Sequence, residues 1–181
     1  HHLAKGEVKW TYSEHANFII RAGKQLNKRK EFDVRRNSHQ PIINLDLTTN
    51  DIQLEWNHPD KFHLDGMIGI QYFYQDNDNN PGTGTTPFIP NYNTGRYSAF
   101  IIESKRIGEH IIEAGARIDH ETSNVRGREV SQAIFRDDYS FMNITSSLGY
   151  IKNIKKSNSF RTSIGTAWRS PNMTELFSFG Q

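Results

Sequence analysis

Hydrophobic and polar side chains alternate along most of the chain. The clearest stretch covers residues 62–76, where most apolar side chains fall on one parity and most polar side chains on the other. A period of two is typical of a β-strand with one apolar face and one polar face. The same alternation predicts eight strands, at residues 3–12, 17–30, 42–57, 62–76, 95–106, 109–123, 138–152 and 159–169.

Helical periodicity is poor throughout these stretches, and it favours a helix in one place only. Residues 172–177 follow Pro171, which suits the first position of a helix, and Ser170 can serve as the N-cap. The sequence therefore predicts an all-β protein with one short helix near residue 175.

The predicted connections alternate between short and long. Short ones fall at residues 13–16, 58–61, 107–108 and 153–158, and long polar ones at residues 31–41, 77–94 and 124–137. Most of the strands exceed the roughly 5–6 residues that are usual in globular proteins. Long antiparallel strands with short periplasmic turns at one end and long extracellular loops at the other are typical of an up-and-down transmembrane β-barrel.

The bilayer gives this pattern its physical reason. Backbone N–H and C=O groups inside a membrane must be paired within the protein, which a closed barrel achieves, and about 9–11 residues let a tilted strand span it. Aromatic residues near the strand ends suit the two interfacial girdles. They are Trp10, Tyr12, Trp56, Phe62, Tyr72, Tyr74, Tyr97, Tyr150 and Trp168. The alternative is a water-soluble antiparallel sheet with one buried face.

Composition excludes several classes without excluding the membrane. The 181 residues contain no cysteine, and only 35% are hydrophobic. This rules out disulfides and cysteine-ligated metal centres, and no apolar run approaches the roughly 18 residues of a spanning helix. A formal net charge of +2 does not indicate a nucleic-acid-binding protein. Because barrel strands need apolar residues only at alternate positions, the low hydrophobic content fits a barrel with polar loops.

The last stretch of the chain resembles a pattern of TonB-dependent outer-membrane receptors, in which a strand ends in aromatic-Arg-x-Pro, followed by Glu-Leu-aromatic and a glycine. The matching positions are Trp168, Arg169, Pro171, Glu175, Leu176, Phe177 and Gly180. Two further stretches are similar to patterns of the same family: residues 95–100 together with 114–119, and residues 25–32. In the first of these, Ile118 stands where the family usually has tyrosine. The resemblance runs over essentially the whole chain.

The resemblance implies that residues 1–181 are part of the receptor's β-barrel domain, an interior piece to which the plug domain and the C-terminal strands would be added. It implies a place in the bacterial outer membrane, among its lipids. It also implies two partners: the TonB complex, reached through the N-terminal region, and an imported ligand. A ferric siderophore or another metal chelate is the expected cargo. A soluble carbohydrate-binding β-sheet module and a passive porin-like barrel are the alternative functions.

Candidate ligand-binding residues come from the predicted extracellular loops. They are Asp76, Asp78, Asn80, Tyr92, Arg126 and Arg128. The basic clusters at 28–30, 35–36 and 126–128 could steer anionic ligands or bind lipopolysaccharide phosphates. Residues 76–82 offer oxygen ligands, but Pro81 and Pro87 stand where a calcium loop needs glycine and glutamate. We therefore expect a polar loop there.

Neither catalysis nor a resident metal or cofactor is predicted. The eight histidines do not form a metal-binding spacing, and no nucleophile, zinc-protease or phosphate-loop motif is present. Paired acidic residues such as Asp137 and Asp138 are routine on a polar barrel wall. Arg169 and Glu175 flank Pro171, and we expect them to order a loop at the extracellular rim rather than to contact the ligand.

Overall fold

A computed structural model describes residues 1–14, 16–33, 35, 37–61, 64–83, 85–128, 133–155 and 158–177. It contains eight strands and one short helix. Their bounds are β1 His2–Ser13, β2 Ala16–Asp33, β3 Asn37–Lys61, β4 Leu64–Asn79, β5 Asn91–Ile107, β6 His110–Arg128, β7 Ile134–Lys155, β8 Asn158–Gly165 and α1 Met173–Phe177.

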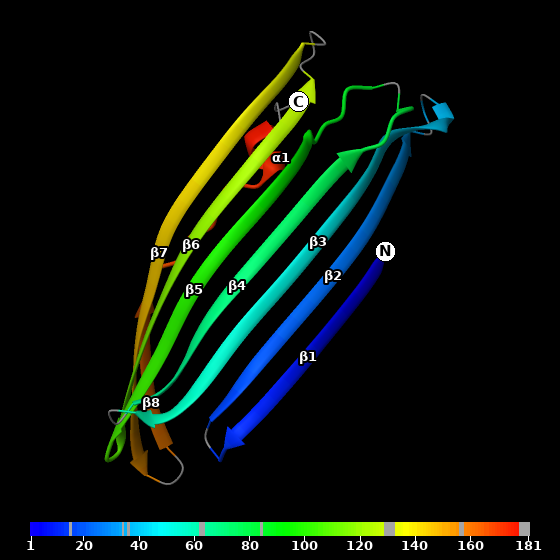
Figure 1. Ribbon diagram of the computed structural model, residues 1–181. Helices are drawn as coiled ribbons and strands as arrows, with labels where there is room; N and C mark the ends of the chain where they lie inside the picture. The colour runs from blue at the N-terminus through cyan, green and yellow to red at the C-terminus, as the bar shows by residue number, and fades with distance from the viewer. Residues whose placement is uncertain are drawn as a thin grey trace.

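The strands form one sheet in which each strand is hydrogen-bonded to its sequence neighbours. The spatial order is β1 to β8, and every pair is antiparallel. The sheet is strongly curved, with β8 and α1 behind it in Figure 1. The predicted all-β, up-and-down architecture of eight long strands is therefore confirmed. The sheet is open, because β1 and β8 lie at opposite edges.

Two adjacent rows across the sheet show how the alternation divides its faces. One row of directly paired residues is apolar on seven strands: Val8, Ile20, Leu54, Ile70, Ala99, Ile118 and Ile144. The next row is polar on the same seven strands: Glu7, Arg21, Gln53, Gln71, Ser98, Asp119 and Asn143. Since successive side chains point to opposite faces, the sheet has one apolar and one polar face.

The polar face is the buried one. Glu55, Asp119 and Glu121 are each at most 8% exposed, whereas Ile20, Leu54 and Ile70 on the apolar face are 40–54% exposed. Side chains crowd together on the concave side of a curved sheet and spread apart on its convex side. This distribution is the reverse of that in a water-soluble sheet, and a lipid-facing outer surface around a polar interior requires it.

Hydrogen bonds and ion pairs connect the strands across the polar face. Arg117 donates to Gln71 at 2.9 Å and to Ser98 at 2.7 Å, and its guanidinium is 2.9 Å from Asp119. Arg21 pairs with Glu7 at 2.7 Å and with Glu55 at 2.6 Å. The buried charges are therefore compensated across neighbouring strands.

Aromatic residues gather where the apolar face meets the short turns. Phe18 stacks on Trp10 at 5.9 Å, on Tyr12 at 5.6 Å and on Trp56 at 6.1 Å between ring centroids. The Trp56 indole N–H donates to the Tyr12 hydroxyl at 2.9 Å. Polar groups at the edge of an apolar band suit the interface between lipid tails and headgroups. This arrangement agrees with the predicted girdle at these positions.

The strands run further into the predicted long loops than the sequence indicated. At the end of the sheet where the long loops were predicted, the strands are connected only by residues 34–36, 80–90 and 129–133. At the opposite end, each short turn has two residues. Polar residues such as Asn44 and Asn124 extend the backbone ladder beyond the apolar band. The predicted strand ends were therefore wrong, because apolar alternation stops at the band while backbone pairing continues.

The single short helix does not approach the length of a membrane-spanning helix, and the described residues contain no other helix that could be one.

Candidate functional site

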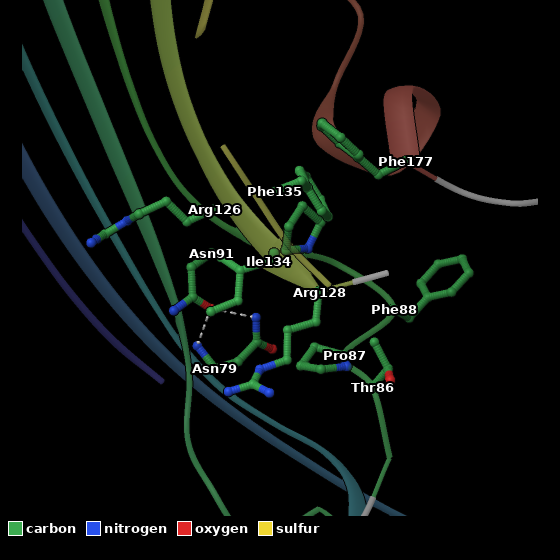
Figure 2. A pocket seen from close by; sticks show the side chains of 12 residues that line it. Asn79, Thr86, Pro87, Phe88, Asn91, Arg126, Arg128, Ile134, Phe135 and Phe177 are labelled. Carbon is green, nitrogen blue, oxygen red and sulfur yellow. Dashed lines mark hydrogen bonds between the residues drawn. The ribbon is translucent and has the colours of Figure 1, made fainter. Parts of the chain in front are cut away.

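A cavity of about 620 Å³ lies at the end of the sheet that carries the longer connections. It is bordered by the tips of β4 to β7, by the connection between β4 and β5, and by α1 (Figure 2). Its lining residues are Asn79, Thr86, Pro87, Phe88, Pro90, Asn91, Arg126, Gly127, Arg128, Ile134, Phe135 and Phe177. The volume falls in the range of small-molecule sites, roughly 300–1,000 Å³.

The connection between β4 and β5 returns over the polar face. The Asn77 amide donates to the Pro90 carbonyl at 3.0 Å, and the Asn79 amide donates to the Ile89 carbonyl at 2.8 Å. Asn77 is 2% exposed and stands on the polar parity of β4. These bonds hold one wall of the cavity, where Phe88 remains 53% exposed.

The segment that follows β8 supplies the opposite wall. The Asn172 side chain accepts a hydrogen bond from the Glu175 N–H at 2.9 Å, while Glu175 accepts one from the Asn172 N–H at 3.0 Å. This reciprocal pair is a capping box. The N-cap of α1 is therefore Asn172 rather than the predicted Ser170, because the Asn172 oxygen reaches the third helical N–H.

A bidentate ion pair closes the same segment. Arg169 donates to the two carboxylate oxygens of Glu175 at 2.8 and 2.5 Å. The Arg169 hydrogen bonds, with a smaller contribution from the Asn172 N–H, lower the pKa of Glu175 to about 2. Both side chains are exposed. The pair bridges the two sides of Pro171, and its role in ordering a loop at the extracellular rim stays a prediction.

Aromatic contacts attach this segment to the concave face of β7. Phe177 stacks on Phe135 with ring centroids 5.4 Å apart and meets Tyr139 edge-on at 6.1 Å. Trp168 lies 6.4 Å from Phe141. All three β7 residues have the parity of the polar row.

Trp168 therefore corrects one prediction. Strand β8 ends at Gly165 rather than at residue 169, so Trp168 lies outside the strand and packs inward. It does not belong to the lipid-facing girdle. The predicted girdle residue Phe62 and the motif residue Gly180 lie outside the described residues, as does Arg36 of one basic cluster.

The six candidate ligand-binding residues divide into three groups. Arg126 and Arg128 border the cavity, and both have the even, outward parity of Ile118 on β6. Tyr92 lies on the concave face, where its hydroxyl donates to Gln75 at 2.8 Å. The backbone N–H of Asn80 donates to the Asn44 carbonyl at 2.8 Å. None of Asp76, Asp78, Asn80 and Tyr92 borders the cavity.

Asp76 and Asp78 share the outward parity of Ile70, beyond the apolar band. Burial raises the pKa of Asp76 and the neighbouring Asp78 raises it further, while a hydrogen bond from Tyr74 and, to a smaller extent, the charge of Arg126 lower it in part. Figure 2 shows the Arg126 side chain extending away from Phe177.

Histidines bond to protein groups at separate places. His58 lies 2.9 Å from Glu103, His110 lies 2.7 Å from the Tyr150 hydroxyl, and His120 lies 3.2 Å from Ser140. Within the described part of the chain, no group of three or more histidine or acidic side chains is arranged to hold a metal ion.

The sequence missed the apolar part of the cavity. Phe88 next to Ile89, and Phe135 next to Ile134, form apolar pairs within the long connections predicted at residues 77–94 and 124–137, and those pairs were the available signal. Their meeting with Phe177 could not be read from the chain, because it depends on the inward return of two connections.

The curved sheet, with its apolar convex face and polar concave face, has the architecture of a transmembrane β-barrel wall. A model of the family "TonB dependent receptor-like, beta-barrel" matches residues 5–181, and the chain belongs to this family. A search of curated proteins and a search of solved structures each found no match. Family membership makes the chain part of an outer-membrane receptor and transporter, and implies interaction with TonB and with an imported ligand. It is a family of transporters rather than enzymes.

Proposed function

We propose that this chain belongs to a receptor that imports a scarce nutrient across the bacterial outer membrane, and that the cargo is a ferric siderophore or another metal chelate. The end with the longer connections faces the outside of the cell. The cavity there is the part of the described wall that receives the ligand. Its exposed aromatic and basic lining supports binding of a bulky, negatively charged chelate.

The single observation that carries the proposal is the position of the cavity. It opens at the end of the sheet beyond the apolar band, on the side of the concave polar face. A ligand bound there stands at the mouth of a polar interior that leads across the bilayer. Such a position suits capture before transport.

Residues 1–181 are, in this proposal, one part of a larger barrel domain. The open edges at β1 and β8 support this, because unpaired strand edges inside a bilayer are costly. TonB supplies energy through the N-terminal region of the receptor, as the family resemblance implies.

The test is uptake of iron-55 bound to a panel of siderophores by cells that carry the receptor gene. We expect uptake of at least one chelate to require both the receptor and TonB. A strain with Gly127→Ala should lose this uptake, because a Cβ atom there would lie 2.5 Å from the Phe135 ring. Gly6→Ala is the matched control, since nothing lies within 4 Å of its Cβ position.

If cells with and without the receptor took up every chelate of the panel equally well, the cargo assignment would be contradicted. Uptake that requires the receptor but persists without TonB would contradict the coupling and favour a passive barrel.

A further inference from the structure

We propose that the outward face of β5 to β7, at the end with the short turns, binds the phosphate of an anionic phospholipid through Lys105 and Lys152. This site lies at the opposite end of the sheet from the cavity, and its occupant is a lipid of the surrounding membrane rather than the imported ligand. The inference rests on the proposed function for the leaflet alone. Since the longer connections face the outside of the cell in that proposal, the two lysines meet the leaflet on the periplasmic side.

The strand register places both lysines on the lipid-facing side of the sheet. Two adjacent rows of directly paired residues complete this face at the short turns: Lys105, Ile112 and Tyr150, then Ile107, His110 and Lys152. Both rows keep the parity of Ile118 on β6, so they share the face of the apolar band. Ile107 and Ile112 are 54% and 42% exposed. They give the lysine stems an apolar surface to lie on while the ammonium groups reach the headgroups.

No acidic side chain compensates the two lysines. Both are exposed, and neither forms an ion pair within the described part of the chain. Glu103 is the next residue of outward parity on β5, but its carboxylate lies 2.9 Å from His58 of β3. Glu109 belongs to the turn beyond the last paired row. Two uncompensated ammonium groups at the edge of the apolar band attract anionic headgroups.

A histidine–tyrosine pair offers a further donor between the lysines. Nδ1 of His110 lies 2.7 Å from the hydroxyl of Tyr150. If the hydroxyl donates, the neutral histidine carries its proton on Nε2, and if Nδ1 donates, the hydroxyl keeps its proton for another acceptor. In either tautomer, the pair has one donor left for a phosphate or ester oxygen.

The spacing of the lysines suits one phosphate held from two sides. Lys105 and Lys152 are separated by strand β6 and by one row, so their Cα atoms stand about 12 Å apart at ordinary sheet dimensions. Two lysine side chains together can cover this span, whose midpoint lies over β6 between His110 and Ile112. At the same end, the described outward residues of β1 to β4 include aromatic side chains but no lysine or arginine. Anionic lipid is therefore selected at β5 to β7.

The test measures lipid selection beside the site in the full-length receptor. Thr162 of β8 is exposed and pairs directly with Tyr150, so it continues the row of Lys105 on the same face. Thr162→Cys is labelled with bimane, and the receptor is reconstituted in phosphatidylcholine vesicles. Dibrominated phosphatidylglycerol or dibrominated phosphatidylcholine then replaces part of the lipid, and bromine quenches the label at close range. Comparison of the two quenching curves gives the binding constant of the anionic lipid relative to the zwitterionic lipid.

We expect phosphatidylglycerol to be preferred at this position. Lys105→Gln and Lys152→Gln should each lower the preference about fivefold, the contribution of one lysine near a charged membrane surface. Lys105→Arg retains the charge and should retain the preference. Lys9→Gln is the matched control, because Lys9 is an exposed lysine of β1 on the parity of the polar face. It should leave the preference unchanged.

Equal quenching by the two brominated lipids in the receptor with all its lysines would overturn the inference, because the lysines would then merely extend into water. An unchanged preference in the double variant Lys105→Gln, Lys152→Gln would also do so, as would an equal loss in Lys9→Gln. The vesicles contain neither siderophore nor TonB, and both leaflets have the same composition. Failure of the uptake experiment therefore leaves this result standing, and failure of the quenching experiment leaves the transport assignment standing.

Discussion

Leu54 offers a sharp test of which face of the sheet meets lipid. It lies in the middle of the apolar row, between Ile20 on β2 and Ile70 on β4, and all three are at least 40% exposed. In a bilayer, arginine at this depth costs about 2–4 kcal/mol of folding free energy. On the water-exposed surface of a soluble protein, the same change stays within about 0.5 kcal/mol.

The matched control is the adjacent residue, Gln53. Its side chain is on the polar row and donates to Glu55 at 2.5 Å. Gln53→Arg keeps a donor beside that carboxylate, so we expect a cost below about 1 kcal/mol. The two variants add the same side chain at neighbouring positions on opposite faces.

The assay is reversible urea unfolding of the full-length receptor from lipid vesicles, followed by tryptophan fluorescence. Leu54→Arg should reduce the folding equilibrium constant by roughly 30- to 700-fold, and Gln53→Arg by less than about fivefold. Equal costs for the two variants would refute the lipid-facing assignment of the apolar row.

Three further predictions concern the cavity and the polar face. The depressed pKa of Glu175, about 2, means that the Arg169–Glu175 pair stabilises α1 fully above the ordinary carboxyl pKa of 4.5 and loses this contribution as the pH falls through about 2. A fluorine NMR titration of 4-fluorophenylalanine at position 177 should show that midpoint, and a midpoint near 4.5 would contradict the pairing. Gly127→Ala should lower the free energy of unfolding, measured by urea titration, by about 1–3 kcal/mol, because the Phe135 ring must move. Gly6→Ala should be nearly neutral. Equal stability of the two variants would argue against the tight ring contact. Arg117→Leu should lower the free energy of unfolding by about 2–4 kcal/mol, because the 8% exposed Asp119 loses its ion pair. Adding Asp119→Leu should recover part of that loss. A double variant no more stable than the single one would show that the two charges are not coupled.

The sequence predicted the faces of the sheet well because they depend on a local property. Side chains at alternate positions of a strand must point to opposite faces, so Leu54 and Gln53 could be separated from the printed sequence alone. The short turn at residues 107–108 was also readable, since Gly108 adopts the left-handed backbone conformation, with φ at 60°, that favours glycine.

Strand ends and the cavity were harder to predict because they depend on distant partners. Backbone pairing extends past the apolar band through residues such as Asn124, whose amide donates to Asp138 at 2.7 Å across the strand pair. The inward return of Pro90 follows from its contact with Asn77, and Trp168 turns inward because its strand ends early. Of the candidate ligand residues, alternation could have placed Asp76 on the outer face, whereas the contact between Phe135 and Phe177 has no local signal.

The central claim is that one face of this sheet contacts lipid and the other lines a polar interior. A site-directed spin-label scan along residues 112–124 of β6 tests it most directly, since the chain contains no cysteine of its own and each label can be placed singly. The account predicts that accessibility to oxygen from the bilayer peaks at even positions such as Ile112 and Ile118, and that accessibility to a water-soluble nickel chelate dominates from Thr122 onward. Equal accessibility of odd and even positions to the nickel chelate across residues 112–118 would contradict it.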